Sequence, residues 1–438
     1  MNKEKDAEKM ENQKIMEKVK YCLRCKIKPC SAKGCPLGND IPGFISEIEK
    51  GNYIKAYEIL LRTTVLAGIC GRICPHFKQC KSACIRGIKS TPVEIGELEA
   101  LVFDKVSADD NILSKICGTE KEEKYKKVKV AIVGGGPAGL TCAAFLARKG
   151  IDVTIYEKYE YLGGILVHGI PEFRLNKEIV ESTVRKILAL GIKVEYKKEL
   201  GKNISIEKLK DNYDKIFLSF GANSSSKIEV EGEELLGVFG GNELLEYKTH
   251  PEYYGKKVAV VGGGNVAVDC ARTINKMGAK SVSVIYRRNK EQMPAEDLEV
   301  EEAIKEGVEF LFQNNIVKII GDKNNTNKKV SKVELIKTEL VQKEGKSRLS
   351  PIDIKGSNYT MDIDYIIMAV GSKVEENILE QINVKKNEIG NIVIDNKYKT
   401  SDDKIYSGGE LAGSKGTVAW AAYTGREAAK NIIEDLEI

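Results

Sequence analysis

Histidine is scarce in this chain of 438 residues, with three copies at His76, His168 and His250. So few residues make histidine-rich metal sites and histidine-based catalytic triads poor candidates. Charge of one sign is not in large excess either, because the chain has 69 basic and 64 acidic residues. No basic stripe interleaved with aromatic residues is present, so nothing indicates a nucleic-acid-binding protein.

Long apolar runs are also missing. No segment approaches the roughly 18 apolar residues of a membrane span. The first twenty residues, MNKEKDAEKMENQKIMEKVK, are mostly charged or amide side chains and lack the apolar core of a signal peptide. We therefore expect a cytoplasmic protein with no membrane partner. Structural disulfides are unusual in a reducing cytosol, so dense cysteines there indicate metal or redox chemistry.

Cysteine is abundant and unevenly placed, since eight of the eleven copies lie between Cys22 and Cys84. Their spacing is C-x2-C-x4-C-x4-C-P, then C-x3-C-x5-C-x3-C from Cys70 onward. Structural zinc sites often pair two C-x2-C motifs, and the second set has none. Iron–sulfur proteins use a local group of three cysteines and a fourth, followed by proline, that reaches another cluster. Cys35 before Pro36 fits that role, so iron–sulfur clusters are favoured over zinc and disulfides, and eight cysteines suffice for two [4Fe–4S] clusters.

The pattern of apolar residues predicts the domain order. Residues 1–125 read as a helical domain that binds two [4Fe–4S] clusters, and a strand–glycine turn–helix–strand plan begins at Val128 and recurs from Lys256. The segments YDKIFLSFGA (213–222) and DYIIMAVGS (364–372) resemble each other, which suggests that the second α/β domain interrupts the first. We predict an α/β fold with two Rossmann-like dinucleotide-binding domains in a glutathione-reductase-like arrangement, preceded by the helical iron–sulfur domain. The expected FAD-binding domain covers 126–245 and 364–438, and the expected NADPH-binding domain covers 246–363.

The first glycine turn has the form G-x-G-x-x-G, with Gly134, Gly136 and Gly139 directly after a strand. Its glycines allow a tight turn, close approach of a pyrophosphate to the backbone, and close packing of the helix on the strand. The helix N-terminus then offers free N–H groups to phosphates. Glu157 ends the second strand, where a carboxylate binds ribose hydroxyls. This site suits FAD.

The second glycine turn, with Gly262, Gly264 and Ala267, is followed by arginines where an acid would end the next strand. A carboxylate there would repel a 2′-phosphate, whereas Arg287 and Arg288 would bind it through charge-assisted hydrogen bonds. NADPH is therefore favoured over NADH. Two different sites in one chain imply a relay in which hydride passes between the nicotinamide and the flavin, a step that strictly requires no protein acid or base.

With these residues assembled, the chain resembles the small subunit of bacterial glutamate synthase and its relatives. These include the flavin and iron–sulfur subunit of NADH-dependent reduced ferredoxin:NADP+ oxidoreductase, sulfide dehydrogenase-type subunits, and the N-terminal part of dihydropyrimidine dehydrogenase. The resemblance covers about residues 20–436 and rests on the cysteine sets and on CGRICP, GGGPAGL, GGILVHGIPEFRL, GGGNVAVD, YRRNKEQMPA and SGGELAGSKGTVAWAAYTGREAA.

The resemblance places the segment 163–175 along the flavin and gives flavin-side candidates at Gly164, His168 and Thr417. With the first glycine turn, it makes the candidate FAD-binding residues Gly134, Gly136, Pro137, Ala138, Gly139, Glu157, Gly163, Gly164, Ile170, Arg174, Gly221, Gly409, Glu410, Thr417 and Val418. The candidate NADPH-binding residues are Gly262, Gly264, Asn265, Val266, Ala267, Arg287, Arg288 and Gly371.

The resemblance also implies how the cysteines divide between two clusters. One cluster is expected on Cys22, Cys25 and Cys30, and the other on Cys35, Cys74, Cys80 and Cys84. The fourth ligand of the first cluster is expected to be Glu99, in the segment IGELE, with Cys70 as the alternative.

The implied function is an electron-input subunit that takes hydride from NADPH onto FAD and passes single electrons through the clusters to a partner. Nothing in the chain resembles the amidotransferase or synthase parts of glutamate synthase, so a glutamate synthase large subunit would have to supply them. The alternative is a subunit of a bifurcating ferredoxin:NADP+ transhydrogenase, which HGIPEFRL favours slightly and which would need a [2Fe–2S] and flavin subunit or ferredoxin as partner. A flavin disulfide reductase would need a redox cysteine pair, whereas Cys142 and Cys270 each stand alone on a nucleotide-binding helix. A non-enzymatic redox sensor is the remaining hypothesis.

Overall fold

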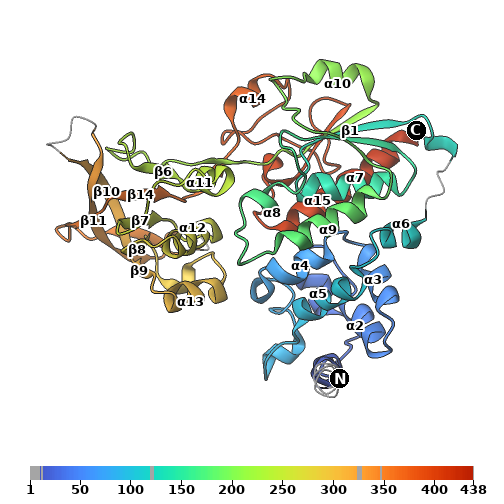
Figure 1. Ribbon diagram of the computed structural model, residues 1–438, viewed down its shortest axis with the longest axis horizontal. Coiled ribbons are helices and arrows are strands. Elements are labelled where there is room, and N and C mark those ends of the chain that lie inside the picture. The colour runs from blue at the N-terminus through green and yellow to red at the C-terminus, as the bar shows by residue number, and fades with distance from the viewer. Residues whose placement is uncertain (1–9, 11–12, 119–122, 323–327, 346–347, 438) are drawn as a thin grey trace. The chain divides into compact units, whose positions relative to one another are not determined.

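The computed structural model describes residues 10, 13–118, 123–322, 328–345 and 348–437, so part of the charged N-terminal segment lies outside the described residues. The chain forms two compact units (Figure 1). Unit 1 comprises residues 1–167, 172–221 and 376–438, and unit 2 comprises 168–171 and 222–375. Across the described ranges, we find no helix with the length and apolar character that crossing a membrane requires.

The N-terminal part of unit 1 is helical, as predicted. Its helices are α2 (Ile41–Glu49), α3 (Tyr53–Leu61), α4 (Ala67–Ile73), α5 (Ile95–Val106) and α6 (Ile112–Cys117). Helix α2 begins where the Asp40 side chain accepts a hydrogen bond from Gly43 N at 3.1 Å, which satisfies one free donor of the first turn. Helices α4 and α5 approach closely because a Cβ at Gly71 would lie 2.6 Å from Ala100 N.

A parallel five-stranded sheet forms the rest of unit 1, in the order β16-β4-β1-β2-β3. Its strands are β1 (Lys129–Val133), β2 (Asp152–Tyr156), β3 (Lys193–Glu195), β4 (Lys215–Leu218) and β16 (Ile405–Ser407). The helices are α7 (Pro137–Ala147), α8 (Ile165–His168), α9 (Lys177–Leu188), α10 (Ile206–Asn212), α14 (Glu376–Glu380) and α15 (Val418–Leu436). Helix α15 packs directly on α7, because a Cβ at Gly425 would overlap the carbonyl oxygen of Ala138.

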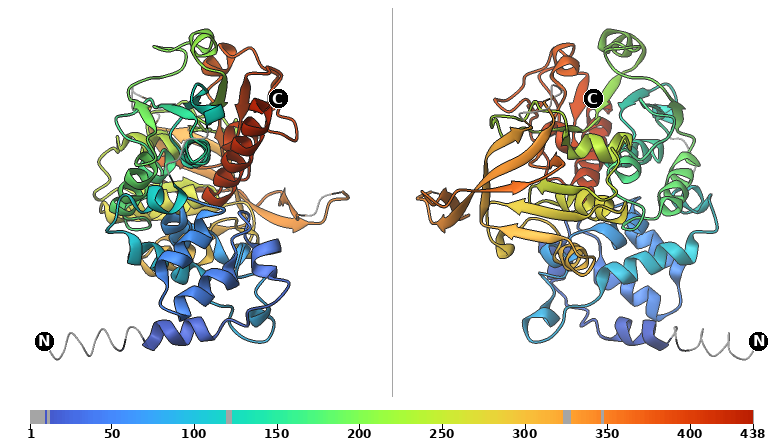
Figure 2. Two further views of the ribbon diagram at one scale, coloured as in Figure 1. Left: turned by 90° about the vertical axis from the view of Figure 1, so that its right-hand side faces the viewer. Right: turned by 60° about the vertical axis from the view of Figure 1, so that its left-hand side comes forward.

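Unit 2 is built on a second parallel sheet, in the order β6-β14-β7-β8-β9. Its strands are β6 (Val238–Gly240), β7 (Lys257–Val261), β8 (Ser281–Tyr286), β9 (Glu309–Phe312) and β14 (Tyr365–Met368). Helices α11 (Gly241–Tyr247), α12 (Asn265–Lys276) and α13 (Asp297–Lys305) cover one face, where they share an apolar core with the strands (Figure 2).

A four-stranded antiparallel sheet covers the other face of the parallel sheet and forms a second apolar core with it. It consists of β10 (Asn314–Gly321), β11 (Val330–Val341), β12 (Ser350–Asp353) and β13 (Tyr359–Asp362), and its apolar side chains pack against β7, β8 and β14. A short ribbon of β5 (Ser224–Ser225) and β15 (Ser372–Lys373) completes the unit.

The boundary of the second α/β unit differs from the sequence-based expectation. Strand β14, which we assigned to the resumed FAD-binding domain at 364–438, pairs in parallel with β7 and β6. The chain returns to unit 1 at Glu376, and unit 2 already begins at Ala222 rather than at residue 246. Both similar strands, β4 and β14, are buried strands of parallel sheets, so their composition cannot show which sheet each one joins.

Candidate functional site

The glycine turn of unit 1 joins β1 to α7. Gly134 has a φ of +98°, in the region that glycine tolerates, and a Cβ there would lie 2.7 Å from Phe220 Cα. A Cβ at Gly139 would overlap the carbonyl oxygen of Gly134, so a larger residue would push α7 away from the turn. At Gly136, by contrast, a Cβ would meet no atom within 4 Å. The backbone at Gly136 is therefore open to approach by phosphate oxygens at the helix N-terminus.

Glu157 follows β2 and points at this turn. Its side chain is buried, with Oε2 accepting from Gly135 N at 2.8 Å and Oε1 accepting from Tyr159 N at 3.0 Å. The carboxylate stands at the carboxyl edge of the sheet, where folds of this kind bind riboses.

Gly163 and Gly164 bring the chain back to the turn after Glu157. Gly163 N donates to Gly135 O at 2.8 Å, and a Cβ at Gly164 would lie 3.0 Å from Gly136 Cα. Gly163 and Gly164 therefore lie beside the glycine turn, and the place of the segment 163–175 along the flavin stays a prediction. His168 is buried and belongs by its contacts to unit 2, so its flavin-side role stays a prediction.

The N-terminus of α15 lies at the same edge of the first sheet. The preceding loop passes close to α7, since a Cβ at Gly409 would lie 3.4 Å from Ala138 Cβ. Gly409 N donates to Thr424 Oγ1 at 2.8 Å, which fixes that loop on α15. Thr417 caps the helix, and its Oγ1 accepts from Trp420 N at 3.3 Å. Two helix N-termini, those of α7 and α15, thus flank one edge of the sheet.

Glu410 is directed toward the start of α15, because a Cβ at Gly416 would lie 2.8 Å from its Oε1. Burial raises the pKa of Glu410. The free N–H groups and the dipole of the first turn of α15 favour negative charge at this place.

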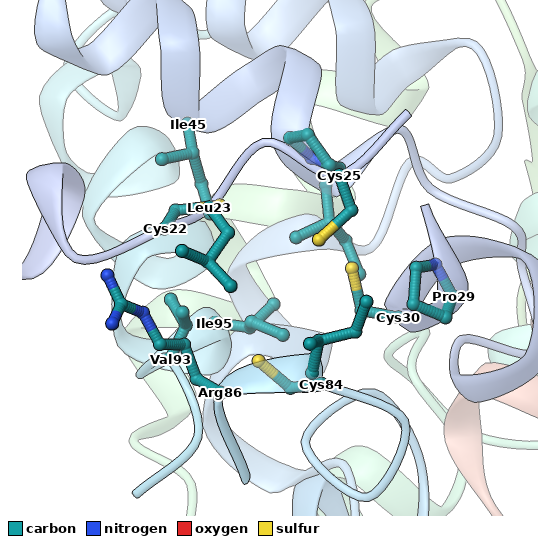
Figure 3. A pocket seen from close by; sticks show the side chains of 13 residues that line it. Cys22, Leu23, Cys25, Pro29, Cys30, Ile45, Cys84, Arg86, Val93 and Ile95 are labelled. Atoms are coloured by element: carbon teal, nitrogen blue, oxygen red, sulfur yellow. The ribbon is translucent and has the colours of Figure 1, made fainter. Parts of the chain in front are cut away.

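Four cysteines line one pocket in the helical part of unit 1 (Figure 3). They are Cys22, Cys25, Cys30 and Cys84, which we call the first cysteine group. The sulfur atoms of Cys25, Cys30 and Cys84 point into the pocket. The rest of the lining is mostly apolar, with Leu23, Pro29, Ile41, Pro42, Ile45, Ile85, Arg86, Val93 and Ile95. Sulfur ligands in an apolar wall are the chemistry of an iron–sulfur site.

The other four cysteines, Cys35, Cys70, Cys74 and Cys80, form the second cysteine group. Cys70 lies on α4, and Cys74 ends that helix. A hydrogen bond with Cys70, and then burial, raises the pKa of Cys74. Burial and then the nearby charge of Glu99, on α5, raise the pKa of Cys35 to about 12. Burial, then the charge of Cys35 and then that of Glu99 raise the pKa of Cys80 well above its usual range. Five possible ligands, including Glu99, therefore gather in this group.

Two thiols of the first group, those of Cys30 and Cys22, are also hard to ionise. Burial raises the pKa of Cys30 to about 11 and raises the pKa of Cys22. Metal ligands must be thiolates, so a positively charged centre has to compensate the buried negative charge. Both groups fit that requirement, and all eleven cysteines are free of disulfides.

Glu99 is oriented by residues that the sequence analysis missed. Asn39 Nδ2 donates to Glu99 Oε1 at 3.2 Å, and Thr63 Oγ1 donates to Asn39 Oδ1 at 2.5 Å. Glu99 is 6% exposed, and burial raises its pKa to about 8, against the opposing effect of Asn39. No local motif joins Asn39, Thr63 and Glu99, so only the fold brings them together.

These positions differ from the ligand division that the resemblance implies, and the ligands themselves stay predictions. Cys84 lines the pocket of the first group instead of joining Cys35 and its neighbours. Cys84 lies beside Cys22 because a hydrogen bond joins the two loops that carry them. Arg86 Nε donates to Tyr21 O at 2.9 Å. Glu99 was expected to be a ligand in the first group, but its charge contributes to the raised pKa of the Cys35, Cys74 and Cys80 thiols of the second group.

The two groups adjoin each other and the start of α15. A Cβ at Gly34 would lie 2.8 Å from Cys80 Cα, so the loop that carries Cys30 rests on the loop that carries Cys80. Gln79, directly before Cys80, is buried, and its Nε2 lies 3.5 Å from Thr417 Oγ1 as a donor. The second cysteine group therefore lies next to the edge of the sheet described above.

Within the part of the chain that the structure describes, no three His, Cys, Asp or Glu side chains are grouped closely enough to hold one ion.

Unit 2 repeats the glycine turn between β7 and α12. Gly262 has a φ of +141°, and a Cβ there would lie 2.8 Å from the carbonyl carbon of Ala369. At Gly264 a Cβ would meet nothing within 4 Å, as at the corresponding glycine of unit 1. Arg287 and Arg288 directly follow β8, with Arg287 exposed and Arg288 half-buried. They stand at the carboxyl edge of the sheet, where the sequence analysis placed them.

Comparison with known sequence families identifies both parts of the chain. The family described as "Pyridine nucleotide-disulphide oxidoreductase" matches residues 128–429. The family described as "Dihydropyrimidine dehydrogenase domain II, 4Fe-4S cluster" matches residues 1–118. These matches correspond to the two glycine turns and to the cysteine-rich helices.

Individual relatives match most of the length of the chain. The glutamate synthase [NADPH] small chain of Escherichia coli is 33% identical over 435 residues, covering 95% of this chain and 90% of that relative. The NADPH-Fe(3+) oxidoreductase subunit beta of Geobacter sulfurreducens is 35% identical over 350 residues, covering 78% of this chain and 50% of that relative. Among solved structures, Mycobacterium tuberculosis FprA in complex with NADPH shares the fold, with a TM-score of 0.63, 18% identity, and coverage of 71% of this chain and 85% of that one.

The fold and the matching families therefore make this protein an NAD(P)H-dependent flavin oxidoreductase joined to an iron–sulfur module. The chain belongs to the glutamate synthase small-chain family. The predicted resemblance, fold class and enzyme class are confirmed, whereas the individual binding residues stay predictions.

Proposed function

We propose that this protein oxidises NADPH at unit 2, accepts the electrons on FAD at unit 1, and delivers them singly through two [4Fe–4S] clusters to a companion subunit. When bound, FAD would supply two-electron chemistry toward NADPH and one-electron chemistry toward the clusters. The family match supports the oxidoreductase class, and the named relatives include small or beta subunits of larger enzymes. The chain's own residues bind, orient and connect these groups.

At the flavin site, Gly136 leaves the backbone open to the pyrophosphate and Glu157 offers its carboxylate to the ribose hydroxyls. The start of α15, at Thr417 and Val418, directs free N–H groups toward negative charge on the ring. Gly409 and Glu410 are proposed to contact the chain between ring and pyrophosphate. No protein acid or base is needed for hydride transfer.

The cysteine positions support two cluster sites. The pocket shared by Cys22, Cys25, Cys30 and Cys84 provides four sulfur ligands for one cluster. The second cluster would be held by Cys35, Cys74 and Cys80, with Cys70 or Glu99 as the fourth ligand. Measuring the iron content of the Cys70→Ser and Glu99→Gln variants separates these two candidates, because only loss of a true ligand lowers the iron content.

The observation that carries the proposal is the contact between Gln79 and Thr417. It supports placing the second cysteine group directly beside the flavin edge. The first group lies farther along, where two of its lining residues, Leu23 and Ile85, are 49% and 37% exposed. Electrons leaving the flavin would therefore reach the second cluster first and leave the protein from the first.

At the nucleotide site of unit 2, Gly264 would leave room for the pyrophosphate of NADPH, with Asn265, Val266 and Ala267 in the first turn of α12. Arg287 and Arg288 would bind the 2′-phosphate. Gly371, after β14, would line the same edge of the second sheet.

The test is anaerobic purification of the chain together with its native partner, followed by mass identification of that partner. We expect FAD, about eight irons per chain for two [4Fe–4S] clusters, and NADPH-dependent reduction of a dye. A glutamate synthase large subunit would establish glutamate synthesis as the outlet, and a [2Fe–2S] flavoprotein would establish the transhydrogenase instead. Absence of both iron and NADPH oxidation would refute the proposal.

A further inference from the structure

A third arginine lies at the end of β8, although it is distant in the sequence from Arg287 and Arg288. Arg348 lies between β11 and β12, and its Nη2 donates to Tyr286 OH at 2.8 Å. The same nitrogen also donates to Gln292 O. Both partners belong to the segment that begins at the end of β8, so Arg348 is held against the strand end that carries the other two arginines.

Tyr286 connects Arg348 to the glycine turn. The tyrosine is buried, and a Cβ at Gly263 would lie 2.6 Å from its Cδ2, so its ring rests on the middle residue of the turn. Its hydroxyl donates to Gln292 O at 2.9 Å and accepts from Arg348. The Arg348 guanidinium is therefore about one tyrosine ring away from the turn where a dinucleotide pyrophosphate binds.

The antiparallel sheet of unit 2 fixes this arrangement. Thr338 Oγ1, on β11, donates to Arg287 O at 3.0 Å, and Gln313 N donates to Arg288 O at 3.0 Å. Arg288 Nε in turn donates to Leu349 O at 3.1 Å, next to Arg348. The three arginines are thus tied together through backbone contacts, and their positions depend on one another.

The electrostatics of this arrangement call for an anion. Among the described residues, the side chains of Arg288 and Arg348 donate to backbone carbonyls and to Tyr286, and no ion pair joins Arg287, Arg288 or Arg348 to a carboxylate. A guanidinium carries five N–H donors, and both hydrogen bonds recorded for Arg348 use Nη2 alone. Three permanent positive charges at one strand end repel each other unless an anion is bound, and a phosphate with two negative charges meets that need with bidentate geometry.

We propose that Arg348 is a third 2′-phosphate ligand and a determinant of the preference for NADPH over NADH. This inference rests on the proposed function, because it assumes that unit 2 binds NADPH. Arg348 is placed by the hairpin between β11 and β12, which lies outside the strand–turn–helix unit that carries the glycine turn and the other two arginines. A contact with the pyrophosphate or adenine would instead affect NADPH and NADH alike, so cofactor preference distinguishes the two roles.

The experiment compares Arg348→Gln with wild type in the complete protein, using steady-state dye reduction with NADPH and with NADH. We expect KM for NADPH to rise about tenfold, with kcat unchanged and kcat/KM for NADH unchanged. Binding of 2′,5′-ADP should weaken about tenfold by calorimetry, whereas binding of 5′-AMP should not change. Arg348→Lys should recover part of the loss because it restores the charge without the planar fork.

Two further variants make the result decisive. Lys343→Gln removes one exposed positive charge from the same hairpin and should leave all these constants unchanged. The double variant Arg287→Gln, Arg288→Gln tests the proposed function itself. If the double variant abolishes NADPH preference and Arg348→Gln does not alter it, the role of Arg348 is wrong. If the double variant also retains full preference, the proposed NADPH site is wrong as well. Equal losses with NADPH and NADH in Arg348→Gln would overturn the 2′-phosphate assignment.

Discussion

Replacement of Cys84 by serine tests the division of the cysteines most sharply. Cys84 shares its pocket with Cys22, Cys25 and Cys30, and the Arg86–Tyr21 hydrogen bond holds it there. Loss of one thiolate from that group should therefore remove the first cluster and leave the second intact.

The expected size of the effect follows from the two sites. Two [4Fe–4S] clusters contain about eight irons, so Cys84→Ser should lower iron to about four per chain. The assay is iron and sulfide analysis of anaerobically purified protein, with electron paramagnetic resonance of the reduced sample. The remaining signal should match that of Cys22→Ser.

Cys74→Ser is the matched comparison, because Cys74 belongs to the second cysteine group. It should leave the other signal and remove the one that survives in Cys84→Ser. If Cys84→Ser and Cys74→Ser lose the same signal, the two residues bind one cluster, and the division drawn from the structure is incorrect.

Other substitutions probe the framework around the sites. Gly136→Ala should fold, because the added methyl group meets no protein atom, but it should retain little FAD, because that methyl group would stand where the phosphate oxygens approach the backbone. Gly139→Ala should also lower the midpoint of thermal unfolding, because its methyl group overlaps the turn. Glu306→Gln should destabilise unit 2 by about 1–2 kcal/mol at pH 7, a figure reduced for solvent screening of this partly exposed pair, since Arg272 hydrogen bonds lower the pKa of Glu306 to about 2 from the usual 4.5. That contribution is present above pH 4.5 and is lost as the pH falls toward 2, so denaturant midpoints of wild type and variant should converge in acid; a constant difference would contradict the assignment. Arg426→Leu should lower the free energy of unfolding by about 2–4 kcal/mol and lower the iron content, because the buried guanidinium donates to two backbone carbonyls of the cysteine-rich part. Unchanged iron content and stability would show that these hydrogen bonds are dispensable.

The glycine turns were predictable because each motif is local. A strand, a turn of six residues and a helix follow one another, and each glycine meets a steric demand within that short segment. Glu157 and Arg287 were predictable for the same reason, since the end of the next strand lies beside the turn in any parallel sheet of this type.

The grouping of the cysteines depended on contacts between distant segments. Spacing alone indicated iron–sulfur chemistry, but the place of Cys84 depends on Arg86 meeting Tyr21, 65 residues away. The link between Gln79 and Thr417 spans 338 residues, and the position of Arg348 depends on how a hairpin returns to β8. Strand β14 was misassigned because a buried parallel strand carries no mark of the sheet that it joins.

The central claim is that electrons from NADPH leave this protein through the cysteine-bound clusters. Its most direct test compares wild type with the double variant Cys22→Ser, Cys25→Ser, using anaerobic stopped-flow reduction by NADPH and reduction of the co-purified companion subunit. We predict that flavin bleaching by NADPH keeps its rate in the variant, while reduction of the companion subunit falls at least a hundredfold. Reduction of the companion at the wild-type rate, in protein that lacks the first cluster, would contradict the account.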